Sequence, residues 1–456
     1  MNEDSRQEGD RETGLPEHTG LTESESRLAG EQKIRDLQKQ SFRKGVRRGA
    51  LGGVIVCALV VFAGGMIANS RSDTTTLSVT VTDEDGNETT ETQTYDSVLD
   101  AETVDKINYL AAYIQAYYYE DVDEEELQQG LFEGLFSSLD AYSTYYSEEE
   151  YEEIYSETIS GSYSGIGATL QQDADTYQVT VIQVQEGSPA EEAGIEEGDI
   201  ITEADGYEAA DMELSEFVTH IKGEEGTSVS LTIYRPDEDE YIELEVTRET
   251  LDIETVSWDM LEDETGYIAI SEFSENTTDQ FVEAVEELQS EGMENLIVDL
   301  RDNPGGTLTS VVEILQYIVP EGLIVYTEDK YGCRDEYRST GEYTLDIPLV
   351  VLVNENSASA SEIFAGAVKD RDCGTLLGTT TYGKGVVQGL QELTDGSALK
   401  LTTSRYYTPD GVCIQGTGIE PDVELEYEFL GSEDDDYDYS LDNQIQAALE
   451  LLEEEE

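Results

Sequence analysis

Residues 349–369 read LVVLVNENSASASEIFAGAVK and join two apolar patterns through a polar run. The five aliphatic residues at 349–353 are typical of a buried strand, and residues 363–369 have the spacing of a helix. The same order recurs from Gly266 onward, with strand patterns at 267–270 and 296–300 and helical patterns at 279–288 and 307–318. This alternation of strands and helices predicts an α/β layer.

The polar run between strand and helix contains three serines, Ser357, Ser359 and Ser361. A serine at this place is well situated to act as a nucleophile, because the positive end of the helix dipole stabilises developing negative charge. The spacing does not distinguish the three serines. The structural alternative is a capping box, in which Ser359 is the N-cap residue and Glu362 stands at N3.

A nucleophilic serine needs a general base, and histidine is nearly absent from this chain. His18 and His220 are the two present, and we expect His220 to be a surface or groove-lining residue on a helix of another segment. Lysine is then the available base, and Lys384 stands between two glycines that let a partner approach closely. An amine with an ordinary pKa of about 10.4 must be desolvated and shielded from surface carboxylates to serve near neutral pH.

Two more glycine-containing clusters bear on the chemistry. Asp299–Gly306, DLRDNPGG, follows a strand pattern, and its Gly305-Gly306 N–H groups could complete an oxyanion hole, although a plain tight turn gives the same pattern. Gly378–Lys384 is close to a phosphate-binding loop, but that loop needs Ser or Thr after its lysine, and this chain has Gly385. A phosphate site is therefore not expected.

Residues 160–250 change to short β-branched runs separated by glycine, proline and aspartate turns. They resemble a PDZ domain, and the motifs that carry this are Gly165-Ile166-Gly167-Ala168, Ser188-Pro189-Ala190, Ala193-Gly194-Ile195, Gly198-Asp199-Ile200-Ile201, Asp205-Gly206 and Gly223–Gly226. The backbone N–H groups of Gly165, Ile166 and Gly167 are the predicted binding site for the carboxylate of a peptide C-terminus.

The charge is unevenly distributed along the chain. Residues 1–48 contain 10 basic and 10 acidic residues, and the remainder contains 14 basic and 94 acidic residues, so the remainder carries the whole net charge of −80. So acidic a chain repels phosphates, which argues against binding to nucleic acid. Cysteine and histidine are too few for a zinc site, and no metal or other cofactor is expected.

Residues 49–70 contain no charged side chain, a length that suits one helical crossing of a bilayer. Four basic residues at 43–48 directly precede this stretch, so the positive-inside rule places the N-terminus in the cytoplasm and residues 72–456 outside it. A cleavable signal peptide is the main alternative, but the polar leader is long and no clear cleavage site follows. A buried globular helix fits the Gly-rich, all-round apolar composition poorly.

The expected organisation has seven parts. They are a cytoplasmic polar tail at 1–48, a transmembrane signal anchor at 49–70, a stalk at 71–96, an N-terminal helical region at 97–159, a PDZ domain at 160–250, the α/β core at 251–430 and an acidic C-terminal tail or helix at 431–456. The helical stretches at 97–158 and 441–456 offer contacts for a homodimer. Cys333, Cys373 and Cys413 lie where disulfides are allowed, and their pairing stays open.

Taken together, these features make the chain resemble the C-terminal processing peptidases, or tail-specific proteases, of the serine type. The resemblance runs from about residue 98 to residue 423. It is carried by Ser138-Leu139-Asp140, the PDZ series, Gly266-Tyr267-Ile268, Asn303-Pro304-Gly305-Gly306, the Ser-Ala-Ser-Ala-Ser run, Tyr382-Gly383-Lys384-Gly385 and Gly418-Ile419-Glu420-Pro421-Asp422. Ala141 is a departure, because the family usually has proline at this position.

The resemblance implies an α/β protease core with an inserted PDZ domain, and an endopeptidase that captures the free C-terminal tail of protein substrates. Together with the uncharged span at 49–70, this predicts a membrane-anchored endopeptidase. It implies that Ser359, the middle serine, is the nucleophile, that Lys384 is the base and that Gln388 orients the lysine. It also implies an oxyanion hole made by the backbone N–H groups of Gly305 and Ala360. Asp370 matches an acidic position of the family and is expected to support the structure.

Two proteins without this activity are the alternatives. The first is a catalytically inactive PDZ protein that only binds peptides, and the intact residues Ser359, Lys384 and Gln388 argue against it. The second is an extracellular adhesion or stalk protein, which no repeat or cell-wall motif supports.

Overall fold

The computed structural model describes residues 74–82, 88–174, 176–432 and 437–455. The predicted cytoplasmic tail and the predicted membrane span at 49–70 lie outside these ranges. Within them, no helix combines the length and the apolar character that a bilayer crossing requires.

The N-terminal part of the described chain contains two strands, three helices and one further short strand. They are β1 (Thr74–Thr82), β2 (Glu88–Asp96), α2 (Ala101–Tyr117), α3 (Glu124–Phe136), β3 (Thr144–Tyr146) and α4 (Glu148–Ile154). The segment predicted as a stalk forms an antiparallel pair, β1 with β2. The predicted helices are present, and the N-cap carboxylates of Asp100 and Asp123 accept hydrogen bonds from the first turns of α2 and α3.

The PDZ segment is a six-stranded antiparallel sheet with two short helices. Its elements are β5 (Ala168–Gln172), β6 (Val179–Val184), α5 (Pro189–Ala193), β7 (Ile200–Ala204), β8 (Tyr207–Glu208), α6 (Leu214–Ile221), β9 (Ser228–Arg235) and β10 (Glu240–Thr247). The strand order is β10-β9-β7-β6-β5, and β8 pairs with β7. The chain enters and leaves through a two-stranded ribbon, β4 (Ser162–Gly165) with β11 (Glu249–Asp252). The predicted β-rich domain is confirmed.

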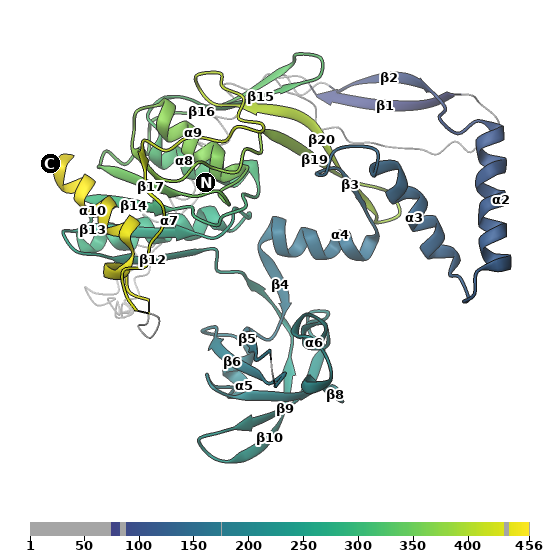
Figure 1. The fold of residues 1–456 in the computed structure, drawn as a ribbon, viewed down its shortest axis with the longest axis horizontal. Coiled ribbons are helices and arrows are strands. Elements are labelled where there is room, and N and C mark those ends of the chain that lie inside the picture. Colours follow the sequence, from purple (N-terminus) through teal and green to yellow (C-terminus); the bar gives the residue numbers. More distant parts are fainter. Residues whose placement is uncertain (1–73, 83–87, 175, 433–436, 456) are drawn as a thin grey trace, which may run out of the picture. The chain divides into compact units, whose positions relative to one another are not determined.

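The core is built on a second six-stranded sheet, several of whose strands are labelled in Figure 1. Its order is β12 (Val256–Met260), β13 (Thr265–Ile270), β14 (Asn295–Asp299), β17 (Leu349–Val353), β18 (Thr375–Gly378) and β21 (Val423–Glu424). All neighbours from β13 to β21 are parallel, and β12 is antiparallel to β13. The helices that connect these strands are α7 (Thr277–Glu291), α8 (Leu308–Ile318) and α9 (Ala360–Asp370). The predicted α/β alternation is confirmed.

Both faces of this sheet are covered, as the unbroken apolar run of β17 requires. Helices α7, α8 and α9 pack against one face of the sheet, the face to which Val351 and Val353 of β17 belong. The opposite face, with Val350 and Leu352, is covered by α10 (Asn443–Glu455). The apolar side of α10 is therefore buried within its own chain, and the predicted dimer contact through this helix stays a prediction.

A third sheet lies beside the core sheet and contributes residues to the candidate site described below. Its strands are β15 (Gly322–Asp329), β16 (Arg334–Ser339), β19 (Val386–Glu392) and β20 (Ala398–Tyr407), in the order β16-β15-β20-β19. Strand β3 of the N-terminal region pairs with β20, joining Lys400 to Thr144 across 256 residues of sequence. The three cysteines outside the predicted span are free thiols.

Candidate active site

The three polar clusters recognised in the sequence follow three neighbouring parallel strands. Asp299–Gly306 begins at the end of β14, the serine run follows β17, and the loop to Lys384 follows β18. The carboxyl ends of parallel strands share one edge of a sheet, so the clusters meet there. Their contacts confirm it: Ala358 N donates to Asn303 O at 3.0 Å, and Tyr382 N donates to Ser357 O at 3.1 Å.

The three serines of the run occupy different environments. Ser357 Oγ donates to Leu300 O at 2.7 Å, and Ser361 Oγ donates to Asn303 O at 3.0 Å, so both fully buried hydroxyls hold the neighbouring turn. Ser359 stands between them at the junction of loop and helix, with φ 55° and ψ −110°. A non-glycine residue in this region is strained, and a nucleophile on a sharp strand-to-helix turn is held in this way. The structure thus separates the serines that spacing could not.

Glu362 connects the predicted nucleophile to the predicted base. Its carboxylate is fully buried and accepts four hydrogen bonds. Oε2 accepts from the backbone N–H of Ser359 at 2.9 Å and of Lys384 at 2.8 Å. Oε1 accepts from Thr381 Oγ1 at 2.7 Å and Gly383 N at 2.8 Å. The capping-box interpretation describes only the first of these bonds, and we call the whole set the Glu362 clamp.

Burial raises the pKa of the Glu362 carboxyl, and the four hydrogen bonds oppose this effect. Tyr406 adds a second bridge, because its hydroxyl shares its single hydrogen between Ser359 O, at 3.1 Å, and Lys384 O. Burial raises the pKa of Tyr406 as well, so the phenol stays protonated and can donate. Backbone N–H and C=O groups of both residues are therefore fixed by the same two side chains.

Lys384 has the environment that its predicted role requires. Burial, followed by the charge of Lys400, holds its pKa below the ordinary lysine value, and Glu362 acts in the opposite direction. Its Nζ lies 5.0 Å from the centre of the Tyr142 ring. No hydrogen bond joins Lys384 Nζ to Ser359 Oγ or to any other described residue. The predicted proton transfer from the serine thus requires the lysine side chain to move.

Gln388 stands near Lys384 but is bonded elsewhere. Its Nε2 donates to Thr402 Oγ1 at 3.2 Å, and Thr402 Oγ1 donates in turn to Asp140 Oδ1 at 3.2 Å. In this conformation Gln388 orients β20 and not the lysine amine. Its predicted role stays a prediction that requires the amide to exchange Thr402 for Lys384.

Of the two predicted oxyanion donors, one backbone N–H has no acceptor among the described residues and the other already has one. Ala360 N donates to no described residue, and it lies 2.9 Å from the position that a side chain on Gly305 would occupy. Gly305 adopts φ 104°, so its backbone reaches the nucleophile only because it lacks a side chain. Its own N–H donates to Asn303 Oδ1 at 2.8 Å. Gly305 N therefore has to leave Asn303 before it can bind an oxyanion.

The predicted carboxylate-binding loop lies where the PDZ sheet begins. Gly165 ends β4, and the carbonyl oxygens of Ile166 and Gly167 accept from Ala190 N at 2.7 Å and Gln185 N at 2.9 Å. Gly167 needs φ 81°, and a side chain there would meet Ser188. The Tyr163 ring lies against Gly165. His220 stacks on Tyr207 with ring centres 3.8 Å apart, in keeping with a surface role.

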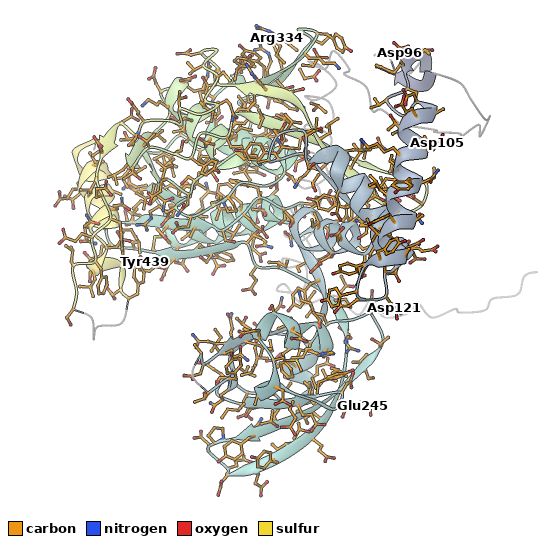
Figure 2. All side chains as sticks on the ribbon, turned by 45° about the vertical axis from the view of Figure 1, so that its right-hand side comes forward. Asp96, Asp105, Asp121, Glu245, Arg334 and Tyr439 are labelled. Atoms are coloured by element: carbon orange, nitrogen blue, oxygen red, sulfur yellow. The ribbon has the colours of Figure 1, made fainter. Side chains whose placement is uncertain are left out.

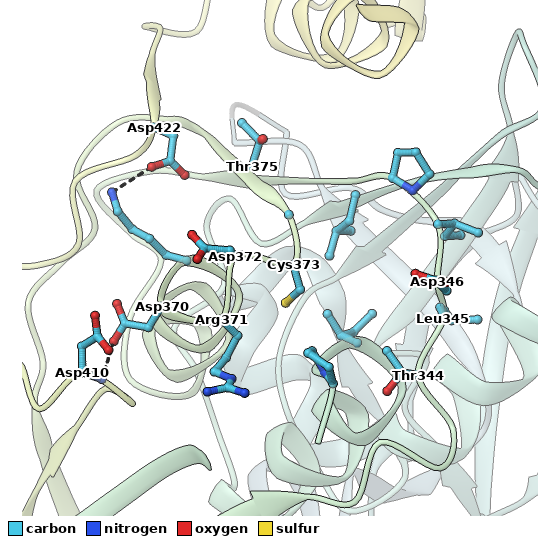
Figure 3. A pocket seen from close by; sticks show the side chains of 17 residues that line it. Thr344, Leu345, Asp346, Asp370, Arg371, Asp372, Cys373, Thr375, Asp410 and Asp422 are labelled. Atoms are coloured by element: carbon cyan, nitrogen blue, oxygen red, sulfur yellow. Dashed lines mark hydrogen bonds and ion pairs between the residues drawn. The ribbon is translucent and has the colours of Figure 1, made fainter. Parts of the chain in front are cut away.

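A cavity lies at the opposite end of α9 from Ser359. It has a volume of about 910 Å³ and is lined by the first residues of β17 and β18 and by residues 369–374 (Figure 3). Asp370 accepts there from Asp410 N at 2.9 Å, which fits its predicted supporting role. Because all three polar clusters lie at the carboxyl edge of the sheet, we place the chemistry at that edge and not in this cavity.

Comparison with known proteins agrees with this arrangement. The model of peptidase family S41 matches residues 264–425, and that of the PDZ domain matches residues 164–246. A model of the activating protease CtpB N-terminal domain matches residues 54–150. The carboxyl-terminal-processing protease of a Picosynechococcus species is 38% identical over 298 residues, which are 63% of this chain and 70% of the relative. The chain belongs to peptidase family S41, among the carboxyl-terminal-processing proteases.

Further relatives of this family are similar over the same part of the chain. The carboxyl-terminal-processing protease of a Synechocystis species is 36% identical over 293 residues, 63% of this chain and 68% of that protein. Among solved structures, a photosystem II D1 C-terminal processing protease is 30% identical and covers 72% of this chain and 88% of that one, with a TM-score of 0.42. The chain is a serine-type peptidase with a PDZ domain.

Three contributors to this S41 site were not recognised in the sequence. Glu362 was interpreted only as a capping residue, Tyr406 lies in an unremarked strand, and Tyr142 belongs to the N-terminal region. The one available signal was Ser138-Leu139-Asp140, which the family resemblance included without giving it a role. Tyr142 follows this motif by two residues.

Proposed function

We propose that this S41 peptidase is a membrane-anchored endopeptidase that acts outside the cytoplasm and cleaves protein substrates with a Ser359–Lys384 dyad. The observation that carries the proposal is the Glu362 clamp, in which one buried carboxylate binds the backbone N–H groups of both residues. A lysine with a lowered pKa, beside a serine held on a strained turn, is the combination that a serine nucleophile needs in the absence of histidine.

In the proposed reaction the neutral amine of Lys384 takes the proton of Ser359 Oγ as this oxygen attacks the peptide carbonyl carbon. The carbonyl oxygen becomes an oxyanion and is stabilised by the N–H of Ala360 and, once released by Asn303, that of Gly305. The C–N bond then breaks, and Lys384 gives its proton to the leaving amine. Water, deprotonated by the same lysine, attacks the acyl-enzyme and releases Ser359. Replacing Ser359 and Lys384 tests this sequence of steps, as set out in the Discussion.

The PDZ domain is proposed to capture the substrate through its free C-terminal carboxylate. The support is the glycine-containing loop at 165–167, a kind of loop whose N–H groups bind anions, with Gly167 at φ 81°; the Gly167 N–H, which bonds to Tyr163, has to leave that ring's hydroxyl first. A substrate with an amidated C-terminus should be cleaved at least about tenfold more slowly, because a charge-assisted hydrogen bond contributes about 1.5–3 kcal/mol. Steady-state rates on paired free-acid and amide peptides measure this. Equal rates would reject capture through the carboxylate.

Anchoring by residues 49–70, with residues 72–456 outside the cytoplasm, rests on the uncharged span and on the four basic residues before it. A reporter that is active only in the cytoplasm, fused after Glu456, should give no signal. The matched control carries the same reporter after residue 48 and should be active. A strong signal from the first fusion would contradict the proposed topology.

The N-terminal helices support a homodimer as part of the same proposal. No residue of α2 or α3 is buried, although Tyr109, Tyr113 and Tyr117 form an apolar stripe along α2 (Figure 2, where Asp105 marks this helix). Faces of this kind are uncommon on monomeric proteins, and a second copy could bury them reciprocally. A monomeric mass in sedimentation equilibrium at micromolar concentration would contradict this part of the proposal.

A further inference from the structure

The turn at residues 140–143 belongs to the N-terminal region, yet it is tied directly to the strand beside the active site. Asp140 Oδ1 accepts from Tyr142 N at 2.9 Å, from Ser143 Oγ at 3.2 Å and from Thr402 Oγ1 at 3.2 Å. Ser143 Oγ accepts in turn from Thr402 N at 3.0 Å. With β3 paired to β20 immediately afterwards, the turn has both its side chains and its backbone fixed on the protease core.

This turn presents the Tyr142 ring to the amine of Lys384, at 5.0 Å from Nζ to the ring centre. A separation under about 6 Å is the range of a cation–π contact, which is strongest where water is excluded. Within the described part of the chain Nζ has no hydrogen bond or ion pair, so the ring is the contact that orients it. Lys400 repeats the arrangement nearby, with Nζ 5.3 Å from the ring of Tyr146.

We propose that Tyr142 is a positioning residue for Lys384: the face of its ring holds the lysine amine in the site, so that the N-terminal region contributes directly to the chemistry of the protease core. This inference rests on the proposed Ser359–Lys384 mechanism and adds to it a residue 217 positions before the nucleophile. The activity would then depend on whether the N-terminal region is docked on the protease core, because the Lys384 amine loses the contact with the Tyr142 ring when the turn leaves β20.

Charged and titratable groups from several elements surround the lysine. They are Glu362 of α9, Lys400 and Tyr406 of β20, Tyr382 of the preceding loop and Tyr142 itself. Burial, and then a hydrogen bond with Tyr382, raises the pKa of Tyr142, so its ring stays neutral and available to a cation. A cation–π contact favours the ammonium form. It therefore acts against the burial and the Lys400 charge that lower the pKa of Lys384.

This balance determines in which direction the pKa of Lys384 changes when the Tyr142 ring is removed. Without the ring, the ammonium form of Lys384 loses an attraction, its pKa falls further, and the neutral base is present at lower pH. The rise of activity with pH should then move down by about half a unit to one unit in Tyr142→Leu, the size expected for one cation–π contact. The rate at high pH should also fall about tenfold, because the amine is less well placed. Tyr142→Phe keeps the ring face and should match the unmutated protein in both respects.

The experiment uses the purified full chain in detergent and two readouts across pH 6 to 10.5. They are the rate at which a fluorophosphonate probe acylates Ser359 and the rate of cleavage of fluorescently labelled β-casein. Tyr331→Leu is the matched control, because the Tyr331 ring lies at the same 5.0 Å from Lys330 Nζ, on an exposed turn. This control should leave both profiles unchanged.

Three results would overturn the inference. They are a Tyr142→Leu profile that superimposes on that of the unmutated protein, an equal shift in the Phe and Leu variants, and an equal shift in the Tyr331 control. If circular dichroism shows that Tyr142→Leu does not fold, Tyr142→Trp decides. Its stronger ring quadrupole should move the rise to higher pH than in Tyr142→Phe, and no difference would reject the contact. Ser359→Ala and Lys384→Arg, measured in parallel, test the proposed dyad separately from Tyr142: cleavage at the unmutated rate by either folded variant would refute the dyad itself, whatever Tyr142 does.

Discussion

Ser359→Ala and Lys384→Ala should each lower peptide cleavage by about 10⁴-fold or more, and the double variant should be no slower than either single one. The nucleophile and its base take part in one proton transfer, so removing either already abolishes that transfer, and removing the other as well has no further effect. The Glu362 clamp and Tyr406 hold the backbone of both residues, and the truncated proteins should therefore keep their fold. Cleavage of labelled β-casein, with circular dichroism on the same samples, measures both effects.

Lys384→Arg is the sharper form of this test. The guanidinium keeps the positive charge and much of the bulk but cannot release a proton at working pH, so the variant should be inactive although folded. Lys330→Arg provides the matched control, since Lys330 also lies 5.0 Å from a tyrosine ring but on an exposed turn. It should keep full activity. A folded Lys384→Arg protein that cleaves at the unmutated rate would place the base elsewhere, and the Ser–Lys mechanism would have to be withdrawn.

The pH dependence of the unmutated enzyme follows from the same groups. Lys384 must be neutral to accept a proton, so activity should rise with pH, and burial places this rise below the ordinary lysine pKa. Burial also raises the pKa of Glu362, so the clamp carboxylate becomes protonated at a higher pH than an exposed glutamate. Both effects reduce activity on the acid side.

Gln388→Ala should lower the rate without abolishing it, because the predicted role of Gln388 is orientation.

Glu362→Gln should produce the second large effect. The carboxylate accepts four donors, and an amide would replace one accepting oxygen with an NH₂ group that faces donors. Leaving buried donors unpaired should lower the free energy of unfolding by about 2–4 kcal/mol. Since the same bonds fix Ser359 and Lys384, activity should fall at least about 100-fold. Denaturant unfolding and cleavage rates at a temperature where the variant is folded measure the two losses separately.

Glu355→Gln is the control for this change. Glu355 lies in the loop that precedes α9, is exposed and accepts one hydrogen bond, from Thr379 Oγ1 at 3.1 Å. Its replacement should change the free energy of unfolding by less than about 0.5 kcal/mol and leave the rate unaltered. Unmutated activity in Glu362→Gln would show that the clamp does not position the dyad.

Much of this protein could be predicted before its structure. The apolar run at 349–353 gave a strand buried on both faces, and the polar clusters after 299, 353 and 378 lay at the carboxyl ends of strands. Periodicity and turn residues are local properties, so they predict elements reliably enough to bring these clusters to one sheet edge. Composition likewise identified the uncharged stretch at 49–70, which lies outside the described residues.

The tertiary structure decided which side chains act together. Ser359 is distinguished from Ser357 and Ser361 by the bonds that the outer two make to residues 300–303. Glu362 has the spacing of a capping residue, and its second task appears only because the loop at 381–384 folds over it. The bonds of Gly305 N to Asn303 and of Gln388 to Thr402, and the burial of α10, were equally invisible.

The physical reason is the range of each interaction. Helical and strand periods are set by neighbours a few residues apart, and the sequence records them directly. A hydrogen bond or a ring contact depends on which distant segments the packed sheets bring together, as with Tyr142 and Lys384, 242 residues apart. The sequence by itself determined the α/β order, the PDZ motifs and the place of the serine run. Only the packed structure decided which groups hold the nucleophile and the lysine, because Glu362, Tyr406 and Tyr142 reach them through the packing of separate elements.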